Sequence, residues 1–174
     1  MKKLLSSDKM YVMKSKISGA GRGVFARKDI KKDETVEVCP IIKVPKYDMA
    51  NLNDSTLVTY FFYFGKSHEQ LLIALGFGSI YNHSYKPNAK YKIKNKENLI
   101  EFIALADIKK DEEITYDYST VVGSHSTWTM ECSCGSENCR RIIGSILTIP
   151  QFQLRYYIAR GVLPDFVSKE LNLS

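Results

Sequence analysis

The chain has 174 residues, of which 44% are hydrophobic and 25% charged, and its formal net charge is +6. This length suits one globular domain with a short appendage, and a chain of this size folds without disulfides. No run approaches about 18 consecutive apolar residues, so we expect no transmembrane helix. The N-terminus starts with lysines but lacks the apolar run of a signal peptide, so we expect an intracellular, cytoplasmic protein.

The basic charge is spread along the sequence. Lysines are scattered rather than gathered in one block, and the chain contains none of the common nucleic-acid-binding motifs. A solvated basic surface explains this distribution, and so does attraction to an acidic partner. We therefore do not expect direct nucleic-acid binding to be the primary function.

The sequence pattern of residues 10–118 predicts mostly short strands. One further segment, Asp54–Phe64, is compatible with either a buried helix or a strand, because its apolar pattern does not distinguish the two. The predicted strands are rich in β-branched or aromatic residues: Tyr11–Ile17, Thr35–Val38, Ile41–Val44, Ala89–Lys94, Leu99–Ala104 and Ile114–Tyr116.

One octapeptide occurs twice. Asp29–Val36 reads Asp-Ile-Lys-Lys-Asp-Glu-Thr-Val, and Asp107–Ile114 reads Asp-Ile-Lys-Lys-Asp-Glu-Glu-Ile. Each copy predicts a polar turn that leads into a strand. Two copies are too few for a repeat array, so they indicate two similar β units within one domain.

The C-terminal region changes to a helical pattern. Pro150 and Gly161 bracket an apolar segment as start and stop signals of a helix, in which Phe152, Tyr156 and Ala159 share one face. Pro164–Leu171 predicts a second short helix. We expect this region to cover an open side of the core, which makes the fold mostly β with a helical C-terminal cap.

Two motifs predict loops beside a ligand. Ser18–Phe25 holds three glycines in five residues, which allows positive φ and close approach of a ligand to the backbone. It opens no helix, so it matches neither the dinucleotide-binding nor the Walker phosphate loop. Tyr81–Asn88 reads Tyr-Asn-His-Ser-Tyr-Lys-Pro-Asn, and its turn formers and hydrogen-bonding side chains can fix an irregular loop beside a polar ligand.

Two later motifs carry phenols and thiols. In Glu113–Tyr118, strand alternation places Tyr116 and Tyr118 on one face and Asp117 on the other; the phenols either line a pocket or pack in a core. Cys132–Cys139 has three cysteines in a Cys-x-Cys-x4-Cys loop, a pattern that suits a soft metal but supplies only three thiolates.

In this order the four motifs resemble the SET-domain protein-lysine methyltransferases, in a small form with a post-SET cysteine segment. The resemblance covers residues 10–144. It implies a SET fold of short strands with a pseudoknot, in which the segment after Tyr118 threads the loop of Asn82. The implied domains are a SET domain at 10–120, a post-SET segment at 128–144 and a helical extension at 149–174.

The resemblance also implies a reaction and its residues. S-adenosylmethionine would donate a methyl group to a substrate lysine that enters from the opposite face. Tyr118 matches the catalytic tyrosine, and Tyr116 matches the aromatic residue that tunes product number, which implies mono- or dimethyllysine. The cofactor-binding residues implied are Ala20, Gly21, Arg22, Gly23, Asn82, His83, Tyr118 and Ser133.

The chain departs from the family pattern in two places. Ile80-Tyr81 stands where many members have Arg-Phe, and Tyr85 stands where many have the cysteine that is the fourth zinc ligand. Zinc at Cys132, Cys134 and Cys139 therefore stays open, with Cys39 or His125 as substitute fourth ligands.

The expected partner is a protein that presents a lysine. Histone tails are the usual substrate inferred for the family, which adds a nucleus or a host nucleus as a possible location; other proteins remain open, as does the oligomeric state. The alternative function is a non-catalytic SET-like module that binds a peptide. The cofactor-loop glycines, Asn82 and Tyr118 argue against it.

Overall fold

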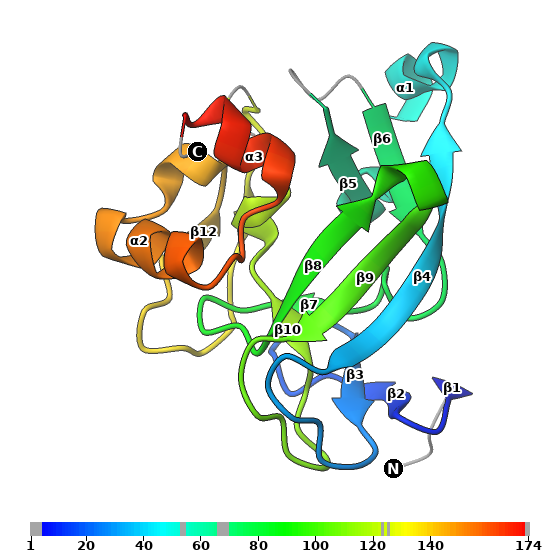
Figure 1. Ribbon diagram of the computed structural model, residues 1–174, viewed down its shortest axis with the longest axis vertical. Coiled ribbons are helices and arrows are strands. Elements are labelled where there is room, and N and C mark those ends of the chain that lie inside the picture. The colour runs from blue at the N-terminus through cyan, green and yellow to red at the C-terminus, as the bar shows by residue number, and fades with distance from the viewer. Residues whose placement is uncertain (1–4, 53–54, 66–69, 123, 125, 173–174) are drawn as a thin grey trace.

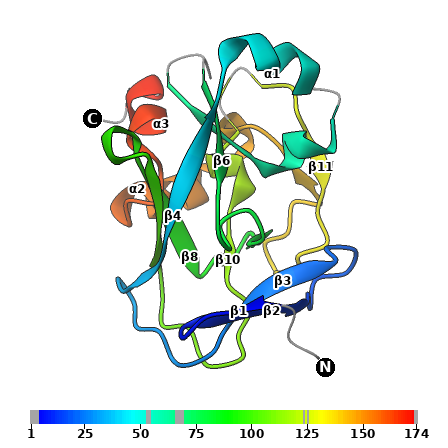
Figure 2. The ribbon, with the colours of Figure 1, turned by 90° about the vertical axis from the view of Figure 1, so that its right-hand side faces the viewer.

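The computed structural model describes residues 5–52, 55–65, 70–122, 124 and 126–172. Two antiparallel sheets form the body, a small one ordered β1-β2-β3 and a larger one ordered β5-β6-β4-β9-β8. Figure 2 shows the small sheet lying across the lower end of β4. The strands are β1 (Leu5–Ser6), β2 (Met10–Lys14), β3 (Arg22–Ala26), β4 (Thr35–Val44), β5 (Phe61–Phe64), β6 (Gln70–Ala74), β8 (Ala89–Lys94) and β9 (Leu99–Ala104).

Two ladders of two residues connect the loops. β7 (Asn82–His83) pairs in parallel with β10 (Thr115–Tyr116), and β11 (Met130–Glu131) pairs antiparallel with β12 (Ile142–Ile143). The helices are α1 (Lys46–Leu52), η1 (Thr56–Tyr60), η3 (Asn95–Glu97), η4 (Tyr118–Thr120), η5 (Ile146–Thr148), α2 (Gln151–Ala159) and α3 (Asp165–Glu170), where η marks 3-10 helices. The C-terminal helices lie together on one side of the molecule (Figure 1). The predicted fold class, mostly β with a helical C-terminal cap, is confirmed.

The observed strand bounds agree with the predictions for some strands and differ for others. β8 and β9 have the predicted bounds, whereas Thr35–Val38 and Ile41–Val44 form one strand, β4, which runs through Pro40. Proline lacks an amide hydrogen but keeps its carbonyl, and that of Pro40 accepts a hydrogen bond of 2.8 Å from Leu75. The strand therefore continues where a break was predicted.

The segment Asp54–Phe64, described from Ser55 onward, begins with the 3-10 helix η1, none of whose residues is buried, and ends with the strand β5. Ser55 caps η1 by accepting a hydrogen bond from the Leu57 amide, and the chain then extends into β5, which pairs with β6. The sequence left helix and strand open for this segment, and the structure contains one after the other.

The two octapeptides lie against each other as a nearly symmetric clasp. Ile30 and Ile108 form a β-bridge with reciprocal backbone hydrogen bonds, both 2.9 Å. Asp107 accepts from the Lys32 amide, and Asp29 makes the matching bond in the other copy. Both isoleucine side chains are fully buried. The predicted pair of similar β units is confirmed, and the two turns stabilise each other.

The apolar stripe predicted for α2 does share a face, but that face is exposed. Phe152 is 63% and Tyr156 41% exposed, whereas Tyr157 is completely buried. Tyr157 packs in a cluster with Leu105 and with apolar residues of the C-terminal region. The shared face is as predicted, but apolar side chains occupy both faces of α2, so their spacing does not identify the buried one. None of the described helices is long and apolar enough to cross a membrane.

Replacing Ile30 with alanine tests the clasp. We expect Ile30→Ala to lower the free energy of unfolding by about 2–4 kcal/mol, because the fully buried site can collapse only partly. Chemical denaturation followed by circular dichroism measures this loss. The control Ile42→Ala changes an isoleucine that is 50% exposed on β4 and should cost less than about 1 kcal/mol. Equal losses would contradict the clasp's contribution.

Candidate active site

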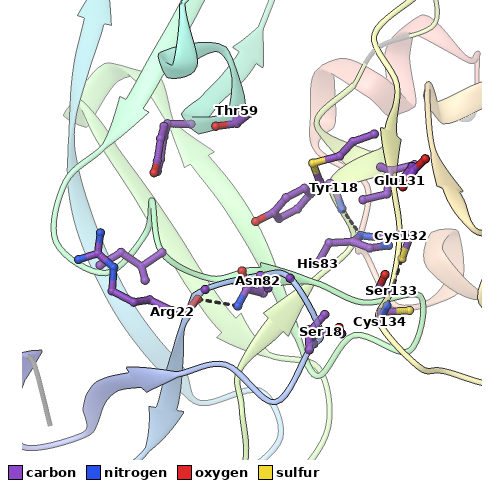
Figure 3. A pocket seen from close by; sticks show the side chains of 18 of the residues that line it. Ser18, Arg22, Thr59, Asn82, His83, Tyr118, Glu131, Cys132, Ser133 and Cys134 are labelled. Carbon is purple, nitrogen blue, oxygen red and sulfur yellow. Dashed lines mark hydrogen bonds between the residues drawn. The ribbon is translucent and has the colours of Figure 1, made fainter. Parts of the chain in front are cut away.

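A cavity of about 630 Å³ opens between the β2–β3 turn, η1, β7 and the cysteine segment. Figure 3 shows side chains from these separate elements converging on it. Its lining residues are Ile17, Ser18, Gly19, Ala20, Gly21, Arg22, Thr59, Tyr60, Ser79, Ile80, Asn82, His83, Tyr118, Met130, Glu131, Cys132, Ser133, Cys134 and Ile143. Segments more than a hundred residues apart in sequence therefore line the same cavity.

The glycine turn is shaped for a close backbone approach. Gly19 and Gly21 have φ values of 78° and 71°, a region that favours glycine. Gly23 has an ordinary φ, but a side chain there would collide with the Glu113 carboxylate and crowd Asn82. The three glycines therefore meet two demands, turn geometry and space for the loop behind the turn.

Glu113 joins the segment that leads into the glycine turn to the loop of Asn82, a role that the sequence analysis did not assign. Its carboxylate accepts hydrogen bonds from the Ser15 hydroxyl (2.7 Å), the Lys16 amide (2.9 Å) and the Asn82 side chain (2.9 Å). The Asn82 amide group also donates to the Arg22 carbonyl at 2.8 Å. The position of Glu113 at the start of the Glu113–Tyr118 motif was the only sequence feature that indicated this role. A glutamate near a strand end usually faces solvent, so the role was not predicted.

The parallel β7–β10 pair places the two tyrosines beside the cavity. Thr115 pairs with Asn82 and Tyr116 with His83. Tyr118 follows as the first residue of η4, rather than lying in a strand, and its hydroxyl donates a 2.7 Å hydrogen bond to the Tyr81 carbonyl. The tyrosine rings lie 4.9 Å apart. Threading of the following segment through the Asn82 loop stays a prediction.

His83 is buried and neutral. Burial, followed by the nearby Arg140 charge, lowers its pKa to about 3. Its Nδ1 accepts a 3.0 Å hydrogen bond from the Tyr118 amide, so the ring proton resides on Nε2. That nitrogen is buried without a hydrogen-bond partner among the described residues, so its donor is unsatisfied beside the cavity that His83 lines.

A second, narrow cavity of about 20 Å³ adjoins Tyr118 and is mainly apolar and aromatic. None of its described lining residues carries a charged side chain: Val58, Thr59, Phe61, Tyr63, Tyr116, Tyr118, Val121, Val122 and Trp128. Burial raises the pKa of Tyr118 well above that of an ordinary tyrosine. The Tyr118 hydroxyl therefore stays protonated at neutral pH.

The structure brings most of the sequence-predicted site residues to one place. Seven of the predicted cofactor residues line the large cavity: Ala20, Gly21, Arg22, Asn82, His83, Tyr118 and Ser133. Gly23 lies behind it, against Glu113, and Tyr116 lines the narrow cavity. Thr59 and Tyr60 of η1 were missed, since no polar motif marks them within their apolar run.

The cysteines of the Cys132–Cys139 segment cluster beside the same cavity. The sulfurs of Cys132 and Cys139 are 3.7 Å apart, close to the edge of a tetrahedron with Zn–S bonds of about 2.3 Å. Ligand atoms of Cys132, Cys134 and His83 lie within 4.8 Å of one another. Cys39 belongs to the main core cluster instead, so it does not complete this set.

Tyr85 occupies the place of the missing cysteine without offering a ligand. Its hydroxyl donates to the Ile142 carbonyl at 2.7 Å, and the Arg140 guanidinium lies 4.1 Å from its ring centre. Burial raises the pKa of Tyr85 to about 12, so its hydroxyl stays protonated. The other substitute ligand considered, His125, lies outside the described residues.

Comparisons with known proteins agree with this geometry. A family model described as SET domain matches residues 21–119. A Schizosaccharomyces pombe protein named histone-lysine N-methyltransferase, H3 lysine-37 specific, is 33% identical over 116 residues, which are 67% of this chain and 76% of that protein. Human histone-lysine N-methyltransferase 2D is 29% identical over 142 residues, 77% of this chain but 2% of that much longer protein.

Solved structures give the same result. The crystal structure of a candidate histone methyltransferase of Plasmodium falciparum matches with a TM-score of 0.52 and 34% identity, covering 71% of this chain and 99% of that one. The methyltransferase domain of human SETMAR has the same fold, with a TM-score of 0.62 at 18% identity over 79% of this chain and 59% of that one. The chain belongs to the SET-domain family of protein-lysine methyltransferases.

Proposed function

We propose that the protein transfers a methyl group from S-adenosylmethionine to a lysine of a histone. The observation that carries this proposal is the meeting of two different cavities at Tyr118 and Thr59. The large cavity has the polar and backbone groups that a cofactor with an amino acid and a nucleoside requires. The narrow one has the uncharged, mainly apolar and aromatic lining that an aliphatic side chain requires, and it would have to widen to admit one. A methyl donor and a lysine would then meet at their junction.

The narrow cavity prepares the amine. Lysine is mostly protonated at pH 7, with a reference pKa of about 10.4, and only the neutral amine is a nucleophile. An uncharged aromatic wall disfavours the ammonium ion and offers no carboxylate to stabilise it. The lysine therefore sheds its proton to water, since the protonated Tyr118 hydroxyl is no base at neutral pH.

The remaining task of the chain is positioning. When bound, the cofactor supplies an activated methyl group on a sulfonium, which becomes a thioether as the N–C bond forms. The hydroxyl of Tyr118, fixed by the Tyr81 carbonyl, would place its oxygen beside this methyl group. Alignment of two reactants can lower a barrier by roughly 7–11 kcal/mol, which makes placement the main source of rate.

Methyl transfer to purified histones tests the activity. We expect methyl-labelled cofactor to mark one or a few histone lysines, and Tyr118→Phe to lower turnover at least tenfold, at least ~1.4 kcal/mol of barrier. Cofactor binding by the variant, measured by calorimetry, should largely survive because only one hydroxyl is lost. The matched control is Tyr47→Phe, at a tyrosine that is 79% exposed on α1, which should retain full activity.

Three outcomes would count against the proposal. Unchanged turnover in Tyr118→Phe would remove that residue from the reaction. Transfer to non-histone proteins alone would correct the substrate and, with it, the nuclear location that a histone substrate implies. Cofactor or peptide binding without any transfer would favour the non-catalytic module.

Mono- or dimethyllysine is the expected product. Tyr116 lines the narrow cavity beside Tyr118, and its hydroxyl takes space that further methyl groups would need. Tyr116→Phe should therefore shift the products toward higher methylation, as read by mass spectrometry of a mapped substrate. Mostly trimethyllysine from the unmodified enzyme would refute this assignment.

Zinc at the cysteine cluster is a separate part of the proposal. Cys132, Cys134 and Cys139 would supply three thiolates, and a closed site requires a fourth ligand. His83 Nε2 is the nearby buried atom without a partner. It can bind a metal only if its proton moves to Nδ1, which lies 3.4 Å from an Asp117 oxygen, as in carboxylate–histidine–zinc sites. That shift would break the hydrogen bond that Nδ1 accepts from the Tyr118 amide, so metal binding by His83 requires the ring to turn from Tyr118 toward Asp117.

Metal analysis of protein purified without chelator tests this site. We expect about one zinc per chain, as for a structural site, with loss of the metal in Cys139→Ser and retention in the control Cys39→Ala. Removal should weaken cofactor binding through the loop of Ser133, without unfolding the main core. A metal-free native protein would contradict the site.

A further inference from the structure

Asp117 lies between the two tyrosines of the site and points away from both cavities. Its side chain is fully buried. One oxygen accepts a 2.8 Å hydrogen bond from the Ser119 amide, and the other accepts a 2.8 Å hydrogen bond from the Tyr157 hydroxyl. Arg140 approaches that second oxygen at 3.9 Å. A buried carboxylate is therefore supported from three separate segments.

The bond to Ser119 determines how η4 begins. Asp117 is the N-cap of this short helix, and Tyr118 is its first residue. A capping side chain fixes the direction in which the chain enters a helix. The orientation of Asp117 is thus coupled to the backbone from which the Tyr118 ring reaches the Tyr81 carbonyl.

Tyr157 comes from α2, beyond the residues 21–119 that match the family. It is fully buried in the C-terminal cluster, while its neighbour Tyr156 is 41% exposed. Packing alone would be satisfied by a phenylalanine, so the hydroxyl has a different use. That hydroxyl donates to Asp117 at 2.8 Å, and Gln153 of the same helix is its second hydrogen-bond partner.

We propose that Tyr157 is a positioning residue for Tyr118, acting through Asp117, so that the C-terminal helix α2 is part of the working active site. The inference rests on the proposed methyl transfer. Without the hydroxyl, the carboxylate loses the close donor that α2 supplies and keeps only those of Ser119, in a place that water does not reach. The position of the Asp117 side chain that caps η4 would become less defined, and so would the orientation of the Tyr118 ring. The large cavity would keep its shape.

The test is Tyr157→Phe, with Tyr156→Phe as the matched control on the same helix. We expect kcat to fall about tenfold, the scale of one hydrogen bond to a charged group, while the KM for cofactor changes less than about twofold. Tyr156→Phe should leave both values unchanged. In a Tyr118→Phe background the second change should have little further effect, because residues that act as a unit are not additive.

Several results would overturn the inference. One is an unchanged kcat in Tyr157→Phe; another is a full tenfold further loss when it is added to Tyr118→Phe. If Tyr157→Phe fails to fold, Asp117→Asn replaces it, and wild-type kcat in that variant would also overturn the proposal. An inactive unmodified enzyme would instead refute the proposed function, so the two failures are distinguishable.

Discussion

The parallel pairing of β7 with β10 is the constraint on which the site depends. It joins only Asn82–His83 to Thr115–Tyr116, which is too short to be stable alone. Side chains complete it, because Asn88 accepts from the Thr115 amide and donates to the Glu113 carbonyl, both at 2.9 Å. The asparagines and the glutamate of the two motifs thus form one unit with the short ladder, which explains why these motifs occur together.

Those motifs could be identified from sequence because their polar residues have fixed partners at fixed spacing. The β hairpin of β8 and β9 could be predicted from alternation, since one face is buried. The contribution of Thr59 and Tyr60 to the lining of the large cavity could not be predicted, because nothing in this mainly apolar segment indicates where the 3-10 helix ends and the strand begins. Only tertiary pairing of β5 with β6 settles that boundary.

The buried face of α2 could not be predicted from the sequence, for a more specific reason. Counting apolar residues ranks Phe152 and Tyr156 equally with Tyr157, but the three differ in what their surroundings demand. The carboxylate of Asp117 needs donors where water is absent, and Tyr157 provides the one that comes from α2. Both this hydrogen bond and the apolar cluster around Tyr157 fit the orientation of the helix, and no local pattern reveals a partner forty residues away.

The alternation Tyr-Asp-Tyr gives the site its charge distribution. Burial keeps the Tyr118 hydroxyl protonated and His83 uncharged. Burial also raises the pKa of Asp117, but hydrogen bonds from Tyr157 and Ser119 and the charge of Arg140 oppose that effect. A carboxylate on the other face, beside the narrow cavity, would stabilise the ammonium form of an incoming lysine and block its attack. In the proposed reaction, a charge placed behind the phenols would order the backbone while the path of the amine stays neutral.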